Sequence, residues 1–243
     1  MFIKSIPNMF TVGNLFLGII SIILVFNNRP DMAAIMVVLA ILMDGLDGRV
    51  ARALNVQSEF GKELDSLSDV ISFGVAPAFI MYVTSFQEMN AMGWIVTAIF
   101  PICGALRLAR FNVVEGTPGY FIGLPIPAAG GILSTLALFH NDIHPFILMA
   151  STLALSFLMI STLKYPSFKK LGLRKSTIWV TPFLIVLALA LALLFKGNLA
   201  KLIFIPMLLY ALYGLKKNVE QLILRKKRHQ AILDEPINQE IRF

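Results

Sequence analysis

The chain has 243 residues, of which 57% are hydrophobic and only 14% are charged. Soluble domains carry about a quarter charged residues, so these groups are too few to cover a water-exposed surface, and most of the surface must face lipid. The single cysteine, Cys103, excludes an internal disulfide and a CxxC metal site. The net charge of +7 comes from short basic loops and a basic tail, which favours anionic lipid headgroups over nucleic acid as partners.

Eight apolar stretches are long enough to cross a bilayer, which takes roughly 20 residues of helix. The fifth is the weakest, because prolines and glycines between Pro125 and Gly131 crowd its start. Such helix breakers are tolerated where neighbouring helices or a cavity satisfy the freed backbone groups. The sequence predicts an all-α, polytopic membrane helix bundle, with a transmembrane domain over 1–215 and a basic cytoplasmic tail over 216–243. The predicted spans are 6–27, 31–53, 65–86, 91–112, 123–140, 145–164, 177–196 and 198–215.

The basic residues predict the orientation, because cytoplasmic loops of membrane proteins carry an excess of Lys and Arg. With both termini in the cytoplasm, only Arg29, Lys196 and Lys201 of the 21 basic residues lie outside. The sequence therefore predicts a multi-pass protein of the cell (inner) membrane. The basic run at 225–228 in the tail is either an ordinary topological anchor or a patch that attracts anionic lipid.

Four aspartates interrupt the apolar runs around the second predicted connection. Asp44 and Asp47 end one run, and Asp65 and Asp69 precede the next. The members of each pair are three or four residues apart, so each pair shares one helix face. A turn between the pairs lets them meet at the cytoplasmic ends of two antiparallel helices. Carboxylates beside the hydrocarbon region are costly and usually functional; the alternative is that they only face water at the helix ends.

Carboxylates that point at one another repel without a cation. No His or Cys lies nearby, so an all-oxygen site for Mg²⁺ or Mn²⁺ is predicted. Two ions would balance the charge, and pairs of ions about 3.5–4 Å apart serve phosphoryl chemistry. Gly48, Ala51 and Gly61 let a flat ligand or another helix approach the backbone. Arg52 can reach a phosphate or brace an aspartate.

The nine residues DGLDGRVAR at 44–52, followed by Gly61, Asp65 and Asp69, resemble the signature of the CDP-alcohol phosphotransferase family. Every position of that signature is filled. Shorter motifs at 7–14, 73–77, 107–112 and 123–127 narrow the resemblance to one group within this family. Together they are similar to the membrane-embedded phosphatidylserine synthases of bacteria and archaea.

The resemblance implies a division of roles within the signature. The first three aspartates would bind metal, and Asp69 would be both a metal ligand and the general base. The pocket for the cytidine nucleotide and its lipid would be lined by residues of the signature, with one residue of the first helix nearby. These implied binding residues are Asn14, Gly48, Ala51, Arg52 and Gly61.

Arg107 and Arg110 are the candidates for reading the acceptor alcohol. Serine brings a carboxylate, which arginine matches with two parallel hydrogen bonds, and Asn112 would accompany them. The alternative is that two arginines at a cytoplasmic helix end are topology signals only. The predicted reaction transfers the phosphatidyl group of CDP-diacylglycerol to the hydroxyl of L-serine and releases CMP.

Two competing functions are also compatible with the sequence. A sister enzyme would use another acceptor, such as glycerol 3-phosphate or inositol phosphate. A divalent cation transporter would use the aspartates as its transport site, although such sites usually lie near the bilayer midplane. The sequence also leaves open the choice between Mg²⁺ and Mn²⁺ and between a diacyl and an ether lipid. The resemblance suggests a homodimer without indicating a dimer motif.

Overall fold

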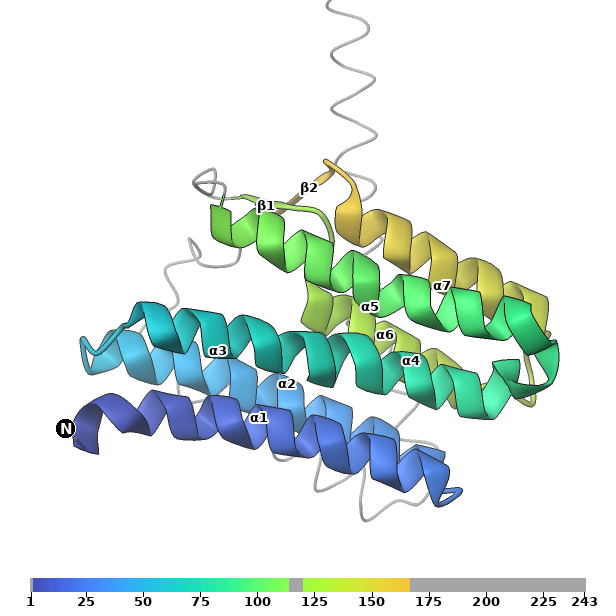
Figure 1. Cartoon of the computed structure of the whole chain (residues 1–243), viewed down its shortest axis with the longest axis horizontal. Helices are drawn as coiled ribbons and strands as arrows, with labels where there is room; N and C mark the ends of the chain where they lie inside the picture. Colours follow the sequence, from blue (N-terminus) through green and yellow to red (C-terminus); the bar gives the residue numbers. More distant parts are fainter. Residues whose placement is uncertain (1, 114–119, 167–243) are drawn as a thin grey trace, which may run out of the picture.

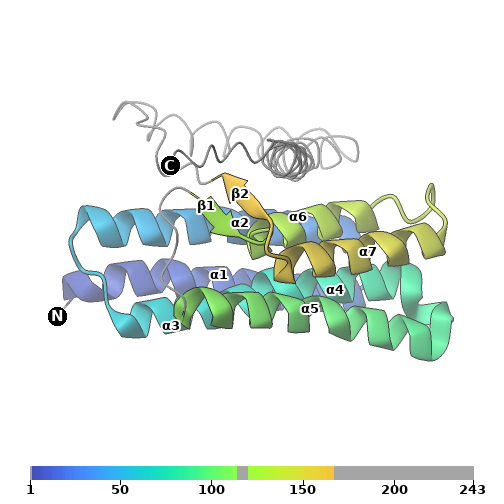
Figure 2. The same cartoon turned by 90° about the horizontal axis from the view of Figure 1, so that it is seen from above.

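The computed structural model describes residues 2–113 and 120–166. Its helices run roughly along one common axis (Figures 1 and 2). A short two-stranded antiparallel ribbon pairs residues 120–122 with 164–166. In chain order the elements are α1 (Phe2–Phe26), α2 (Pro30–Ala53), α3 (Glu59–Asp69), η1 (Val70–Val75), α4 (Ala76–Met81), η2 (Tyr82–Phe86), η3 (Gln87–Met89), α5 (Asn90–Val113), β1 (Tyr120–Ile122), α6 (Ile126–Ala137), α7 (Pro145–Ile160) and β2 (Lys164–Pro166).

The structure confirms the predicted helical fold and contains candidate membrane-spanning helices. Two helical stretches, Ser5–Phe26 and Glu59–Val113, are long and apolar enough to cross a membrane, and α6 and α7 are shorter apolar helices. The second stretch reverses direction at Asn90, so its two arms run back along each other (Figure 1). The number of spans and the side on which the termini lie stay predictions. The predicted spans 177–196 and 198–215 and the basic tail lie outside the described residues.

An apolar stripe on α1 has the spacing expected of a helix side that faces lipid. Met9, Val12, Phe16, Ile19 and Ile23 are all exposed and follow one another at intervals of three or four residues. This spacing puts them on one side of the helix. Water would disfavour so continuous an apolar surface, whereas hydrocarbon does not.

Three asparagines with positive φ allow the first helices to reverse direction within short connections. The φ angles are 56° at Asn28, 52° at Asn55 and 50° at Asn90. Asparagine enters the left-handed region more readily than most residues with a side chain. The connection at Asn55 is the important one for the site, because it returns the chain from the end of α2 to the start of α3.

The π-helical segment η1, directly after Asp69, is tightly enclosed by its neighbours. A Cβ added to Gly18 of α1 would lie 2.7 Å from the Cα of Ser72, and one added to Gly130 of α6 would lie 2.9 Å from the Cα of Phe73. Only glycine permits backbones to approach this closely. Short π-helical segments occur frequently at functional sites, and here the close contact with α1 fixes α1 against the end of α3.

Two predicted helix boundaries are wrong in the region of the ribbon. The fifth predicted helix, at 123–140, is the shorter α6, which begins at Ile126 after its N-cap Pro125 and carries Pro127 in its first turn, where a missing N–H is tolerated. Gly123 instead has a φ of +77° and donates its N–H to the carbonyl of Leu163 at 2.8 Å. The predicted sixth helix, at 145–164, ends at Ile160 because the chain then enters β2. The ribbon is a small departure from a purely helical fold.

Candidate metal centre and adjoining pocket

Three of the four predicted aspartates form a compact group. One carboxylate oxygen from each of Asp44, Asp47 and Asp65 lies within 4.8 Å of the corresponding oxygens of the other two. Asp47 is buried, and the Oδ1 atom of Asp65 is buried without a hydrogen-bond partner among the described residues. An all-oxygen set of carboxylates with an orphaned buried oxygen fits a hard divalent cation such as Mg²⁺ or Mn²⁺.

Asp69 lies one helical turn beyond Asp65 and is 6% exposed. It is not part of the compact group of three, but it interacts electrostatically with Asp44 and Asp65. The structure therefore brings all four aspartates together, with Asp69 one turn further along α3 than Asp65. This arrangement separates one carboxylate from the three that are close enough to share a cation.

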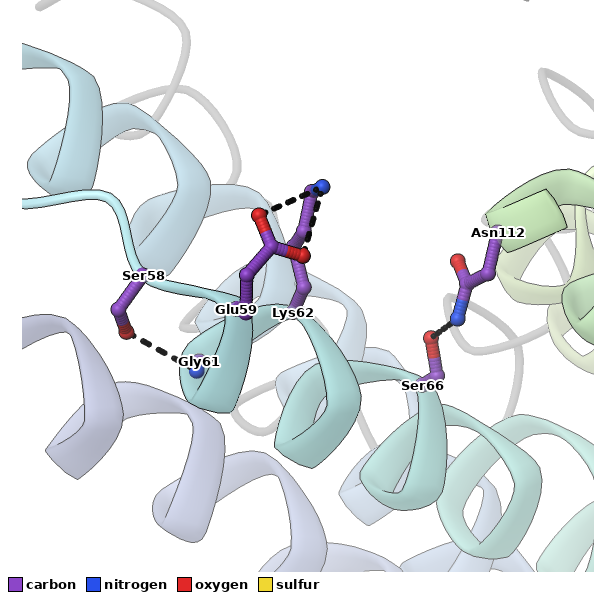
Figure 3. Close-up of polar contacts among 6 residues, drawn as sticks. All are labelled: Ser58, Glu59, Gly61, Lys62, Ser66 and Asn112. Carbon is purple, nitrogen blue, oxygen red and sulfur yellow. Dashed lines mark hydrogen bonds and ion pairs between the residues drawn. The ribbon is translucent and has the colours of Figure 1, made fainter. Parts of the chain in front are cut away.

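The start of α3 is fixed by a side-chain cap. Ser58 precedes the helix, and its hydroxyl oxygen accepts a hydrogen bond from the backbone N–H of Gly61 at 3.1 Å (Figure 3). Serine at this position satisfies one of the free N–H groups of the first turn. The cap starts α3 at Glu59, earlier than the predicted boundary at residue 65, and Asp65 therefore lies in the second turn of a formed helix.

Two side chains of α1 hold aspartates of the site. The Thr11 hydroxyl donates a hydrogen bond to Oδ2 of Asp47 at 2.8 Å. The Asn14 amide donates one to Oδ1 of Asp69 at 3.2 Å. Sequence reasoning missed Thr11, although a polar residue three positions before Asn14 in an apolar helix was a usable signal. It assigned Asn14 to the nucleotide, whereas the structure shows its amide against Asp69.

A cavity of about 560 Å³ opens beside the aspartates. Its volume falls within the range of small-molecule sites, roughly 300–1,000 Å³. Asp47 and Asp65 form part of its wall, so the cavity meets the group of three carboxylates. The predicted binding residues Gly48, Ala51, Arg52 and Gly61 all line it, and Asn14 does not. Lining residues that sequence reasoning did not single out are Pro7, Asn8, Thr11, Val56, Gln57, Ser58, Glu59 and Lys62.

The two glycines of the signature keep this cavity open in different ways. A Cβ on Gly48 would lie 3.4 Å from a guanidinium nitrogen of Arg52, which folds back over the glycine. Arg52 also interacts electrostatically with Asp47. A Cβ on Gly61 would lie 3.1 Å from the Ser58 hydroxyl and 3.2 Å from Oδ1 of Asn8. A side chain at Gly61 would therefore press against both walls of the cavity.

The three predicted acceptor residues lie near the C-terminal end of α5, at the same end of the bundle as the start of α3 (Figure 2). Arg107 is buried. The Arg110 guanidinium donates to the carbonyls of Ile160 at 2.9 Å and Ser161 at 3.2 Å, and so holds the C-terminal end of α7. Asn112 donates to the hydroxyl of Ser66 at 3.0 Å (Figure 3). Asn112 is thereby tied to the residue that follows Asp65.

Comparison with known proteins identifies the family. The sequence profile of the CDP-alcohol phosphatidyltransferases matches residues 4–212. A CDP-diacylglycerol–serine O-phosphatidyltransferase of Helicobacter pylori is 42% identical over 217 residues, covering 86% of this chain and 89% of that protein. One of Bacillus subtilis is 38% identical, covering 68% of this chain and 92% of that protein. An archaetidylserine synthase of Methanothermobacter thermautotrophicus is 39% identical, covering 69% and 72%. The chain belongs to the CDP-alcohol phosphatidyltransferase family.

Proposed function

We propose that this membrane protein is a CDP-diacylglycerol–serine O-phosphatidyltransferase, which makes phosphatidylserine and CMP from CDP-diacylglycerol and L-serine. The observation that carries the proposal is the group of Asp44, Asp47 and Asp65 on the wall of a cavity of nucleotide size. The relatives support serine as the acceptor, since the two bacterial CDP-diacylglycerol–serine O-phosphatidyltransferases align with most of the chain.

The cavity and the carboxylates suit the two halves of the donor substrate. We propose that the cytidine enters the cavity beside Gly48, Ala51 and Gly61, whose small size leaves room for a flat base. The diphosphate would then lie toward the carboxylates and Arg52. A divalent ion, or a pair of ions, would supply positive charge for the diphosphate and for the leaving CMP.

Asp69 is proposed to accept the proton of the serine hydroxyl. As that proton leaves, the hydroxyl oxygen forms a bond to the lipid-side phosphorus, and the bond from this phosphorus to the CMP oxygen breaks. A single in-line displacement accounts for both products. The buried position of Asp69, one turn beyond Asp65, supports this role, because it leaves the carboxylate beside the cation-binding group.

We propose Arg107, Arg110 and Asn112 as the acceptor residues. Their support is their shared place at the end of α5 and the contact of Asn112 with Ser66 beside Asp65. A substitution of Arg110 would also remove its hydrogen bonds to the end of α7, so Arg107 is tested first.

Arg107→Lys is expected to raise the KM for serine about tenfold, the effect of losing about 1.4 kcal/mol of binding free energy. Lysine keeps the positive charge but loses the planar fork that pairs with a carboxylate. The KM for CDP-diacylglycerol should stay near the wild-type value in the same assay. Arg49→Lys, at an exposed position of α2, is the matched control. An unchanged serine KM in folded Arg107→Lys protein would remove Arg107 from the acceptor site.

We also propose a topology for the chain in the membrane. Eight spans over residues 1–215, both termini and the tail 216–243 in the cytoplasm, and a cytoplasmic active site agree with the distribution of Lys and Arg. Cytoplasmic access also suits water-soluble serine and CMP. We propose a homodimer on the family resemblance alone.

A panel of acceptors tests the assignment of the substrate. Purified protein in detergent is given CDP-diacylglycerol and Mn²⁺ or Mg²⁺, with serine, glycerol 3-phosphate, inositol phosphate or no acceptor. CMP release that needs serine supports the proposal. Release only with a phosphorylated alcohol would keep the family and replace the acceptor. Metal flux in proteoliposomes without CMP release would indicate the transporter.

A further inference from the structure

We infer that α1 positions the aspartate site, with Thr11 orienting Asp47 for metal binding and Asn14 orienting Asp69 for proton transfer. This inference deepens the proposed function and rests on it for the roles of the two aspartates. It assigns Asn14 to the orientation of a carboxylate in place of the predicted contact with the nucleotide. Thr11 and Asn14 are positioning residues, because each acts through an aspartate.

Thr11 is placed to fix one face of the Asp47 carboxylate. Its hydroxyl lies 2.8 Å from Oδ2 of Asp47 and 3.3 Å from the carbonyl of Pro7. The shorter contact, to a charged acceptor, is the stronger one. Thr11 is 3% exposed, so its hydroxyl is held against the Asp47 carboxylate in a packed position. Hydrogen bonds of this kind orient metal-binding side chains, and their loss typically costs about 10–100-fold in metal affinity or activity.

Asn14 is held at both its backbone and its side chain. Its backbone carbonyl accepts a hydrogen bond from the Ser72 hydroxyl at 2.9 Å, and its side-chain N–H donates to Asp69 at 3.2 Å. Asn14 is fully buried, and its Oδ1 atom has no partner within the part of the chain that the structure describes. The reversed amide would bring that oxygen against the Asp69 carboxylate, so the bond to Asp69 decides the orientation.

The spacing along α1 shows that these contacts come from one side of the helix. Thr11, Asn14 and Gly18 follow one another at intervals of three and four residues, which places them on the same face. The first reaches α2, the second reaches the end of α3, and Gly18 lets the backbone of η1 approach. One face of α1 therefore connects the two helices that supply the aspartates.

The test uses the purified full chain with two separate measurements. Mn²⁺ affinity is measured by titration without substrate, and kcat and KM are measured by CMP release. The variants are Thr11→Val, Thr11→Ser, Asn14→Leu and Asn14→Ala. Thr152→Val is a matched control, because the buried Thr152 hydroxyl donates within α7 to the carbonyl of Leu148 at 2.8 Å. Ser21→Ala is a second control, because it removes a hydrogen bond of α1 to Ala33 on α2.

Thr11→Val is expected to raise the Kd for Mn²⁺ about tenfold, and Thr11→Ser to restore wild-type affinity, because the hydroxyl returns. The Asn14 variants are expected to lower kcat about 10–100-fold while leaving the Kd for Mn²⁺ and the KM for CDP-diacylglycerol near wild type. Both controls should match wild type. Retained Mn²⁺ binding in the Asn14 variants also shows that the bundle has assembled.

Several results would overturn the inference. Wild-type Mn²⁺ affinity in Thr11→Val would show that Thr11 does not orient Asp47 for metal binding. Unchanged kcat in Asn14→Ala, or an equal loss of Mn²⁺ affinity in the Asn14 and Thr11 variants, would remove the separate role of Asn14. An effect of the same size in Ser21→Ala would reduce both residues to general packing of α1. Wild-type protein that binds Mn²⁺ but releases no CMP would contradict the proposed function, while the titration would still decide the role of Thr11.

Discussion

Asp69→Asn is expected to lower kcat about 10²–10⁴-fold, the range that a positioned general base contributes. Asparagine has almost the same shape as aspartate and keeps an oxygen that can accept the hydrogen bond of Asn14. In the wild-type protein the side-chain nitrogen of Asn14 lies 3.2 Å from Oδ1 of Asp69. It cannot take up the proton of the serine hydroxyl. The substitution therefore separates basicity from position, and steady-state release of CMP measures the effect.

Glu63→Gln is the matched control for this change, because it removes an exposed carboxylate of the same helix. Its kcat should equal that of the wild type. Size-exclusion chromatography of both variants establishes that the protein is folded. Full activity in folded Asp69→Asn protein would show that another group accepts the proton.

Asp44→Asn is expected to weaken Mn²⁺ binding, because it removes a carboxylate of the compact group. Loss of a residue that only orients a metal ligand costs roughly 10–100-fold in affinity, and loss of the ligand itself should cost at least as much. Which of the two proteins, wild type or Asp44→Asn, is the more stable should also depend on whether metal is present. Without metal, three close carboxylates repel, so the variant should unfold at a higher temperature than wild type. With metal, the wild type should gain stability, by about 2.7 kcal/mol at a concentration 100 times its Kd, and the variant should gain less.

Thermal unfolding with EDTA and with Mn²⁺ measures both parts of this prediction. Asp31→Asn is a suitable control, because Asp31 lies in the first turn of α2, at the opposite end from the aspartate group. That variant should keep the wild-type response to metal. Equal stabilisation of wild type and Asp44→Asn by Mn²⁺ would mean that the ion binds elsewhere.

The aspartate group could be predicted from the sequence because its geometry is largely local. Asp44 and Asp47 share a face of one helix, Asp65 and Asp69 share a face of the next, and a short connection at Asn55 makes these helices adjacent. Residue spacing of three and four expresses such geometry directly. Four of the five residues that the family resemblance implied for nucleotide binding line the cavity beside this group.

Contacts between segments that are far apart in the chain are not marked by any residue spacing in the sequence. Arg110 reaches Ile160 and Ser161, about fifty residues away, and no spacing in the sequence indicates that its guanidinium holds the end of α7. The bond of Thr11 to Asp47 likewise depends on how α1 packs against α2. The π-helical η1 arises where Gly18 and Gly130 let two neighbouring helices approach, which helix propensity alone does not express.

The central claim is that the protein joins the phosphatidyl group of CDP-diacylglycerol to serine. The most direct test is to incubate purified protein with Mn²⁺, CDP-diacylglycerol and radiolabelled L-serine, and to measure CMP and labelled lipid together. We expect equal amounts of the two products, and neither product after addition of EDTA. CMP without labelled lipid, or labelled lipid in the presence of EDTA, would contradict it.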